Sequence, residues 1–135
     1  MNAFLWGEDV PAAWDNWDID EDQHLKLQPQ THLLSREVVS DGPLEFRLRS
    51  IHAIGRGSRL RQDLILRAGS PTLVFETEVE WRDKHALLKV AFPTRLNAPR
   101  ARHEIQFGHI ERPVERNDSH EAVKFEVCQH KWTDL

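Results

Sequence analysis

The sequence has one cysteine, no tyrosine and no long apolar run. Cys128 has no second cysteine with which to form a disulfide inside the chain. No apolar stretch approaches the ~20 residues that a membrane-spanning helix needs. Residues 1–11 lack the basic start and the apolar centre of a secretory signal. We therefore expect a protein of the reducing cytoplasm, with no membrane partner.

An excess of basic residues is also missing. Lys and Arg number 18 against 22 Asp and Glu, which gives a net charge of -4. Domains that bind nucleic acid are usually basic, so we expect no nucleic-acid partner. Hydrophobic residues make up 39% and charged residues 30%, which is typical of a globular chain. A length of 135 residues is enough for one domain with a core of its own.

Signals for long helices are absent, and apolar residues instead alternate with polar ones. Six runs with this period of two are predicted as half-buried antiparallel strands: residues 44–48, 60–67, 73–81, 86–92, 105–107 and 123–127. Turn motifs separate several of them, such as Asp41-Gly42-Pro43 and Gly69-Ser70-Pro71. The pattern predicts an all-β fold, a sandwich or a barrel, with little or no helix. Residues 2–24 and 109–121 interrupt the alternation and are predicted to hold functional loops.

Five segments along the chain carry distinctive motifs. They are FLWGEDVP at residues 4–11, WDNWDID at 14–20, HALLKVAFP at 85–93, EIQFGHIERP at 104–113, and KFEV followed by HKW at 124–132. In this order they resemble the signatures of class II α-mannosidases of the cytosolic type, which belong to glycoside hydrolase family 38. The family versions include W-D-A-W-D-I, H-K-L-L-K-V-A-F-P and Y-E-I-Q-F-G-H-x-x-R-P. The matches extend over nearly the whole chain.

The resemblance implies a segment of a much longer enzyme. The family places its nucleophilic aspartate in an α/β barrel whose motifs have no counterpart in this chain. Its divalent metal, zinc or cobalt, is held by side chains of the barrel and of a helical region, also outside this segment. The chain resembles the start of the C-terminal β-sandwich region, with a supersandwich-like fold that forms half of a galactose-mutarotase-like arrangement. We expect residues 1–135 to form a single β-sandwich domain or part of one. The expected function is to support the barrel of a retaining enzyme that hydrolyses terminal α-D-mannosyl residues, with no catalytic or metal-binding residue here and no activity alone.

The first candidate site is the aromatic and acidic cluster Trp14, Asp15, Trp17 and Asp18. Indole faces stack on pyranose rings and carboxylates accept bonds from sugar hydroxyls, so these residues suit a sugar cleft. The alternative is that the indoles pack against the missing barrel. Both interpretations predict exposed tryptophans in this chain.

The second candidate site is the loop of residues 111–120, which matches the family pattern x-R-P-T-H-R-N-T-S-W. Arg112, Arg116 and Asn117 offer several donors, which suits either a sugar or a bond between domains. A plain solvated loop is the third possibility. The chain departs from the family pattern at four positions: Val114, Glu115, Asp118 and His120.

Two further residue classes have structural explanations. The eight histidines show no metal-binding spacing, so no metal site is expected in this segment. The arginines from Arg47 to Arg67 are predicted to pair with Glu76, Glu78 and Glu80 across a sheet rather than to bind nucleic acid.

Two other functions are compatible with these patterns. One is an autonomous carbohydrate-binding module, and the other is a structural or oligomerisation domain. The expected partners are the catalytic barrel, the remaining β-domains and mannosides. A separate copy of the segment could also associate with itself through free sheet edges.

Overall fold

The computed structural model describes residues 2–14 and 17–135. These residues form ten β-strands and two helices of four residues each, and all strand pairs are antiparallel. The all-β prediction is therefore confirmed. The chain divides into two compact units, residues 1–92 and 93–135, and each is described by itself. Neither helix is long and apolar enough to cross a membrane.

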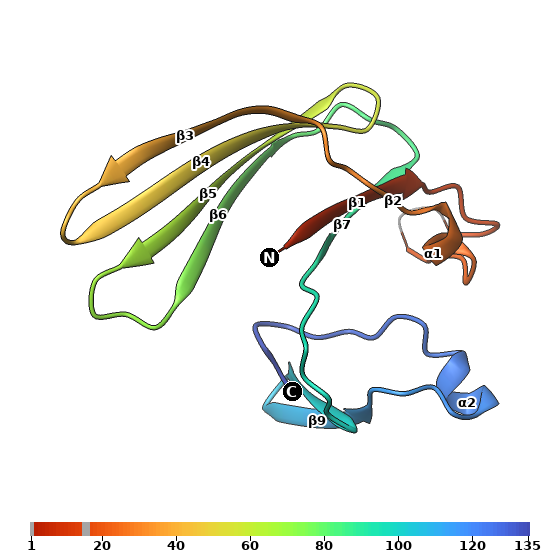
Figure 1. The fold of residues 1–135 in the computed structure, drawn as a ribbon. Coiled ribbons are helices and arrows are strands. Elements are labelled where there is room, and N and C mark those ends of the chain that lie inside the picture. The colour runs from red at the N-terminus through yellow and green to blue at the C-terminus, as the bar shows by residue number, and fades with distance from the viewer. Residues whose placement is uncertain (1, 15–16) are drawn as a thin grey trace. The chain divides into compact units, whose positions relative to one another are not determined.

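A four-stranded antiparallel sheet forms most of the first unit. Its strands lie in sequence order: β3 (Leu33–Asp41), β4 (Glu45–Ile54), β5 (Ser58–Arg67) and β6 (Leu73–Glu80) (Figure 1). Leu64 lies opposite Leu48 on one neighbouring strand and Phe75 on the other, so apolar residues share one face. This face is the one that the alternating pattern predicts to be buried.

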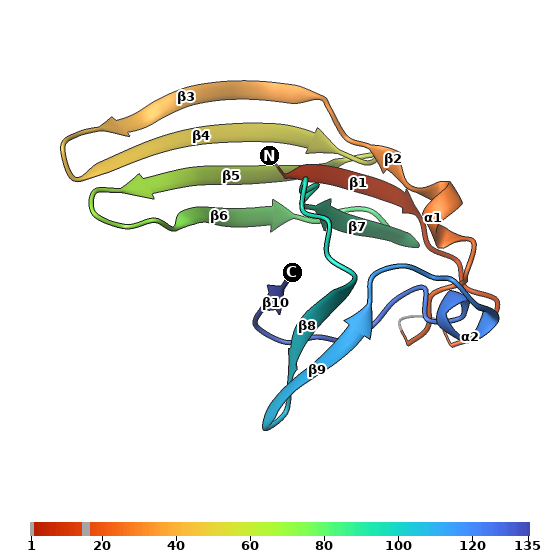
Figure 2. The same ribbon diagram turned by 60° about the horizontal axis from the view of Figure 1, so that its bottom comes forward.

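A smaller sheet packs on that apolar face. It has the order β2 (Gln28–Pro29), β1 (Ala3–Glu8) and β7 (Ala86–Ala91). Phe4 of this sheet packs with Ile54 and Leu60 of the larger sheet, and Trp6 and Leu88 lie against them. The first unit is therefore a two-layer arrangement of antiparallel sheets, as in a sandwich (Figure 2).

Charged side chains occupy the opposite face of the larger sheet. Arg47 donates to Glu76 at 2.7 Å, and Arg61 pairs with Glu78. The predicted pairing of arginines with glutamates across the sheet is therefore confirmed for Glu76 and Glu78, whereas Glu80 pairs with Arg82, two residues further along the chain. Because Glu76 and Glu78 neutralise Arg47 and Arg61, these arginines do not form an unpaired basic patch.

A tight turn between β4 and β5 is fixed by a side chain from elsewhere in the unit. The Asp83 carboxylate accepts hydrogen bonds from the Arg56 amide at 2.9 Å and the Ser58 hydroxyl at 2.6 Å. Gly55, in this turn, has a φ of 56°, in the left-handed region that favours glycine. A Cβ at this position would clash with the indole nitrogen of Trp6.

Short helices complete the two units. Helix α1 (Gln23–Lys26) packs beside β1, and the buried Gln23 donates to the Glu8 carbonyl at 2.9 Å. Helix α2 (Ser119–Ala122) begins after Asp118, whose carboxylate accepts from the Glu121 amide at 2.7 Å. This is a typical N-cap.

The second unit contains a hairpin and one additional short strand. Strand β8 (Arg100–Ile105) pairs with β9 (Gly108–Pro113) on one side and with β10 (Thr133–Asp134) on the other. Two predictions are wrong here. Of residues 105–107 only Ile105 is extended, as the last residue of β8, because Gln106 and Phe107 form the hairpin turn, and residues 123–127 form no strand.

The sequence patterns also missed strands β1 and β3, and β8 apart from its last residue. The stretch of residues 109–121, predicted as a loop, begins with strand β9. Only its remainder is irregular or helical.

Candidate functional site

The first predicted site lies on an exposed turn of the first unit. The Trp14 carbonyl accepts hydrogen bonds from the amides of Trp17 at 2.8 Å and Asp18 at 3.0 Å. The Asp20 carboxylate accepts from the Ala12 amide at 3.2 Å, which links the two ends of the turn. These bonds define the turn without using either indole.

Both indoles of this turn are open to solvent. The exposed fractions are 74% for Trp14 and 89% for Trp17. Trp14 has a φ of 61°, which is uncommon for a residue with a side chain and is found where the surrounding structure requires it. The Asp18 carboxylate accepts from the Ile19 amide at 2.9 Å, and Asp15 lies outside the described residues. The prediction of exposed tryptophans is confirmed, and the exposure fits both interpretations of the cluster.

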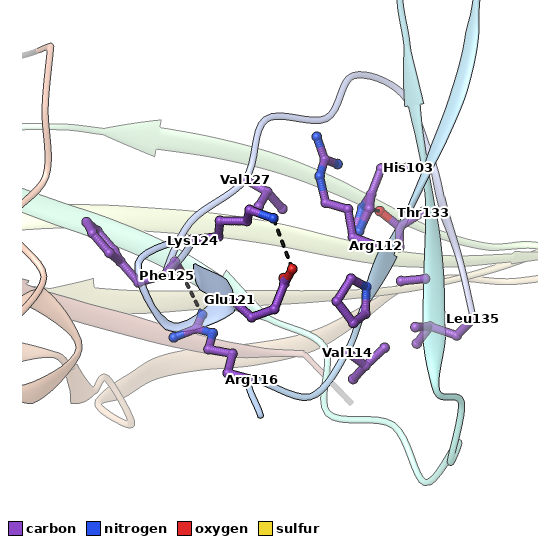
Figure 3. A pocket seen from close by; sticks show the side chains of 12 residues that line it. His103, Arg112, Val114, Arg116, Glu121, Lys124, Phe125, Val127, Thr133 and Leu135 are labelled. Carbon is purple, nitrogen blue, oxygen red and sulfur yellow. Dashed lines mark hydrogen bonds and ion pairs between the residues drawn. The ribbon is translucent and has the colours of Figure 1, made fainter. Parts of the chain in front are cut away.

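The second predicted site surrounds a cavity of about 250 Å³ in the second unit (Figure 3). Strand β9 supplies Arg112, the following loop supplies Arg116, and the segment after α2 supplies Lys124. The structure therefore brings two of the three predicted loop residues to one cavity. The third, Asn117, does not line it and donates to Glu115 at 3.3 Å.

Arg112 has unused hydrogen-bonding capacity at this cavity. Its Nη1 atom is buried and has no hydrogen-bond partner among the described residues. Arg116, by contrast, donates to the Phe125 carbonyl at 2.7 Å. A buried guanidinium nitrogen without an acceptor is costly, so an acceptor from a ligand or another domain would be stabilising.

The remaining charges at the cavity are partly neutralised. Lys124 and Glu121 form an ion pair at 3.0 Å, which Figure 3 shows as a dashed line. His103, on β8, contacts the Thr133 hydroxyl at 3.1 Å. Thus Arg112, Arg116, Lys124 and Glu121 leave a net positive charge on the lining. Oxygen acceptors, as in a sugar hydroxyl or a carboxylate, suit such a site.

Sequence reasoning missed several lining residues. His103, Glu121 and Lys124 line the cavity, although no motif singled them out as a group. The available signal was the strand pattern, because Ala101 and His103 have the spacing of one face of β8. The strand pattern does not indicate which loop covers this face of β8.

No cluster suitable for a metal is present in the described part of the chain. No three His, Cys, Asp or Glu side chains come together there. Cys128 is a free, exposed cysteine.

The fold and these two candidate sites define a small antiparallel β-domain that exposes two indoles and has a cavity with cationic lining residues. The chain belongs to the family described as the glycosyl hydrolases family 38 C-terminal domain, whose model matches residues 1–135. The resemblance inferred from the motifs is therefore confirmed.

Individual relatives agree with this assignment. The chain is 40% identical to alpha-mannosidase 2C1 of Mus musculus and 40% identical to that of Homo sapiens. It is 35% identical to alpha-mannosidase G of Dictyostelium discoideum. Each match covers 99% of this chain and 13% of the relative. The chain thus spans 13% of the length of these curated relatives.

Proposed function

We propose that this chain is a non-catalytic β-domain segment of an α-mannosidase. The intact enzyme would be a retaining glycoside hydrolase that removes terminal α-D-mannosyl residues, and the chain would be inactive alone. The similarity over 99% of the chain and only 13% of the mouse relative supports this proposal, because most of that relative lies outside the match.

We also propose that Arg112 and Arg116 face the catalytic barrel and donate to the mannoside. The observation that carries this proposal is the cavity they share, where Arg112 Nη1 is buried without an acceptor. A sugar hydroxyl or ring oxygen would supply that acceptor. The exposed Trp14, Trp17 and Asp18 would contact the barrel or the sugar beside it.

The proposal extends to the metal and the compartment. The zinc or cobalt ion would bind elsewhere in the intact enzyme, since no three potential ligands converge among the described residues. The cytoplasm is the proposed compartment because one cysteine provides no disulfide within the chain. Partners would be the barrel and the remaining β-domains.

The first test is hydrolysis of p-nitrophenyl α-mannoside by the purified chain, with and without zinc or cobalt. We expect no turnover. Turnover that disappears when a carboxylate of this chain is replaced would show that the segment has its own nucleophile and would contradict the proposal.

The second test examines Arg112 in a full-length α-mannosidase that contains this chain. If Arg112 contacts the sugar, Arg112→Ala lowers kcat/KM by about tenfold or more, with little change in melting temperature. Arg95→Ala is the matched control, because Arg95 is exposed and does not line the cavity. A lower melting temperature with unchanged kcat/KM would instead show a bond between domains.

An autonomous carbohydrate-binding module is the alternative that the exposed indoles of Trp14 and Trp17 favour. Titration of the chain with methyl α-mannoside distinguishes the two. Binding that is lost in Trp14→Ala and Trp17→Ala would support the module.

A further inference from the structure

A second cavity, of about 350 Å³, is lined by residues of the first unit and is partly open to solvent, with Arg36 exposed. It opens between the β1–β2 segment and the inner face of strands β3, β4 and β5. Its polar lining includes Asn2, Arg36, Ser50, His52 and Gln62. None of its described lining residues is Asp or Glu, so Arg36 gives the cavity a positive charge.

Arg36 differs from the paired arginines on the other face of the same sheet. Arg47 and Arg49 each contact the Asp63 carboxylate, at 2.9 Å and 2.8 Å. Arg36 instead donates through Nε to the Ser50 hydroxyl at 3.1 Å and contacts no carboxylate among the described residues. Its two terminal nitrogens therefore remain available to an acceptor.

His52 supplies a second unused group in the same cavity. Its Nδ1 atom is buried and has no hydrogen-bond partner among the described residues, while its ring packs edge-on against Phe4 with 5.4 Å between centroids. Burial of the ring and the charge of Arg36 lower the pKa of His52. The neutral ring carries one N–H, and Nδ1 becomes a donor in one tautomer.

Strand geometry directs both groups to one place. Arg36 lies opposite Ser50 in the β3–β4 pairing, and His52 follows Ser50 by two residues. Residues two apart on a strand point to the same face. Arg36 and His52 therefore converge on the cavity from neighbouring strands.

We propose that this cavity binds one oxyanion, a carboxylate or a phosphate group, between the Arg36 guanidinium and the His52 ring. The planar guanidinium matches two oxygens of such a group, and the ring N–H would donate to the same group. The oxyanion could be an Asp or Glu side chain from the part of the enzyme outside this chain, or free inorganic phosphate. This proposal does not depend on the role of Arg112 in sugar binding.

The test is NMR titration of the 135-residue chain with sodium phosphate, sodium acetate and mannose, with sodium chloride to hold ionic strength constant. Acetate represents an Asp or Glu side chain. We expect an oxyanion to shift the His52 ring signals and the amide signals of Arg36 and Ser50. Tighter binding of acetate indicates a protein carboxylate as the natural occupant, and tighter binding of phosphate indicates the free ion.

Variants show whether the shifts come from this cavity. Arg36→Ala should weaken oxyanion binding by about tenfold or more. Arg36→Lys keeps the positive charge but loses the planar guanidinium group, so it should retain part of the binding. Arg59→Ala is the matched control, because Arg59 is exposed and does not line this cavity. A dispersed NMR spectrum establishes that each variant is folded. If Arg36→Ala does not fold, the comparison of the parent chain with Arg36→Lys still tests the proposal.

Three results would overturn the proposal. The first is the absence of any shift with either anion. The second is a response to mannose alone, which would indicate a polyol site. The third is equal binding by the parent chain, Arg36→Lys and Arg36→Ala, which would show that the anion binds elsewhere.

Discussion

Arg49 holds the Asp63 carboxylate with two hydrogen bonds, from Nε to Oδ1 at 2.8 Å and from Nη2 to Oδ2 at 2.8 Å. Arg47 adds a third, to Oδ2 at 2.9 Å. The carboxylate is 2% exposed, whereas the two arginine side chains remain partly open to water. A buried charge is tolerated here because the two-pronged contact and the additional arginine satisfy its oxygens.

Replacing Asp63 should therefore be strongly destabilising. We expect Asp63→Asn to lower the free energy of unfolding by about 3 kcal/mol, because two cations lose their common acceptor. Urea denaturation followed by circular dichroism measures this change. Glu78→Gln is the control: its pair with Arg61 is exposed, so little change is expected. An equal loss in both variants would contradict the special role of Asp63.

The same carboxylate should make stability depend on pH. Hydrogen bonds from Arg49 and Arg47 lower the pKa of Asp63 to about 2, while the pKa of an Asp in an unfolded chain is about 3.9. A lowered pKa stabilises the fold above the unfolded pKa, and this contribution is lost as pH falls through the folded pKa. The loss between pH ~4 and ~2 should be roughly 2 kcal/mol.

Comparison with Asp63→Asn isolates this contribution to the acid transition. The lowered pKa values of Glu45 and Glu111 act in the same direction and remain in the variant. The parent chain should therefore lose more stability than Asp63→Asn as pH falls from about 4 to about 2. Identical curves for the two proteins would contradict the assignment.

The turn at Gly55 should not accept a side chain. In Gly55→Ala the new methyl group would lie 2.6 Å from the Asp83 carboxylate and closer still to Trp6, in addition to the left-handed strain. We expect a loss of at least about 3 kcal/mol in thermal or urea unfolding. Gly69→Ala has the same kind of φ, +74°, but nothing within 4 Å, so only the strain of about 1 kcal/mol should appear.

The tryptophan turn offers a test of its role in the longer enzyme. In the isolated chain, acrylamide should quench Trp14 and Trp17 more readily than the half-buried Trp6. The double variant Trp14→Phe/Trp17→Phe identifies their share of the fluorescence. Protection in a full-length enzyme without sugar would indicate packing on the barrel, and protection only on adding mannoside would indicate the cleft. Full quenching in both conditions would contradict both roles.

Much of the larger sheet could be predicted because its burial is one-sided. Strands β5 and β6 keep an apolar face and a charged face, so their alternation is visible in the sequence. Strand β3 was missed because its pairing with β4 shifts register twice, which breaks the period of two. The β8–β9 turn was missed because it places Phe107 at a φ of 63° and fully exposed, without the expected Asn or Gly there.

For the cavity of Arg112 and Arg116, the sequence predicted the types of residue but not their arrangement. The motifs selected Arg112 and Arg116, and the structure brings both to one cavity. They could not exclude Asn117, whose amide bonds locally to Glu115. The cavity of Arg36 and His52 had no sequence signal, because it depends on the pairing of β3 with β4, in which Arg36 lies opposite Ser50, 14 positions away.

The charged residues on the outer face of β4 and β5 also disfavour a shifted register of this hairpin. In the native pairing, Arg49 lies opposite Asp63 and Arg47 lies opposite Ile65. Sliding one strand by two residues would keep every side chain on its proper face, so burial alone would tolerate the error. In one direction that slide sets Arg49 against Arg61, and in the other it sets Arg47 against Arg67. The first slide still places Asp63 opposite Arg47, but each slide adds a pair of like charges directly opposite each other, which is destabilising and favours the native alignment.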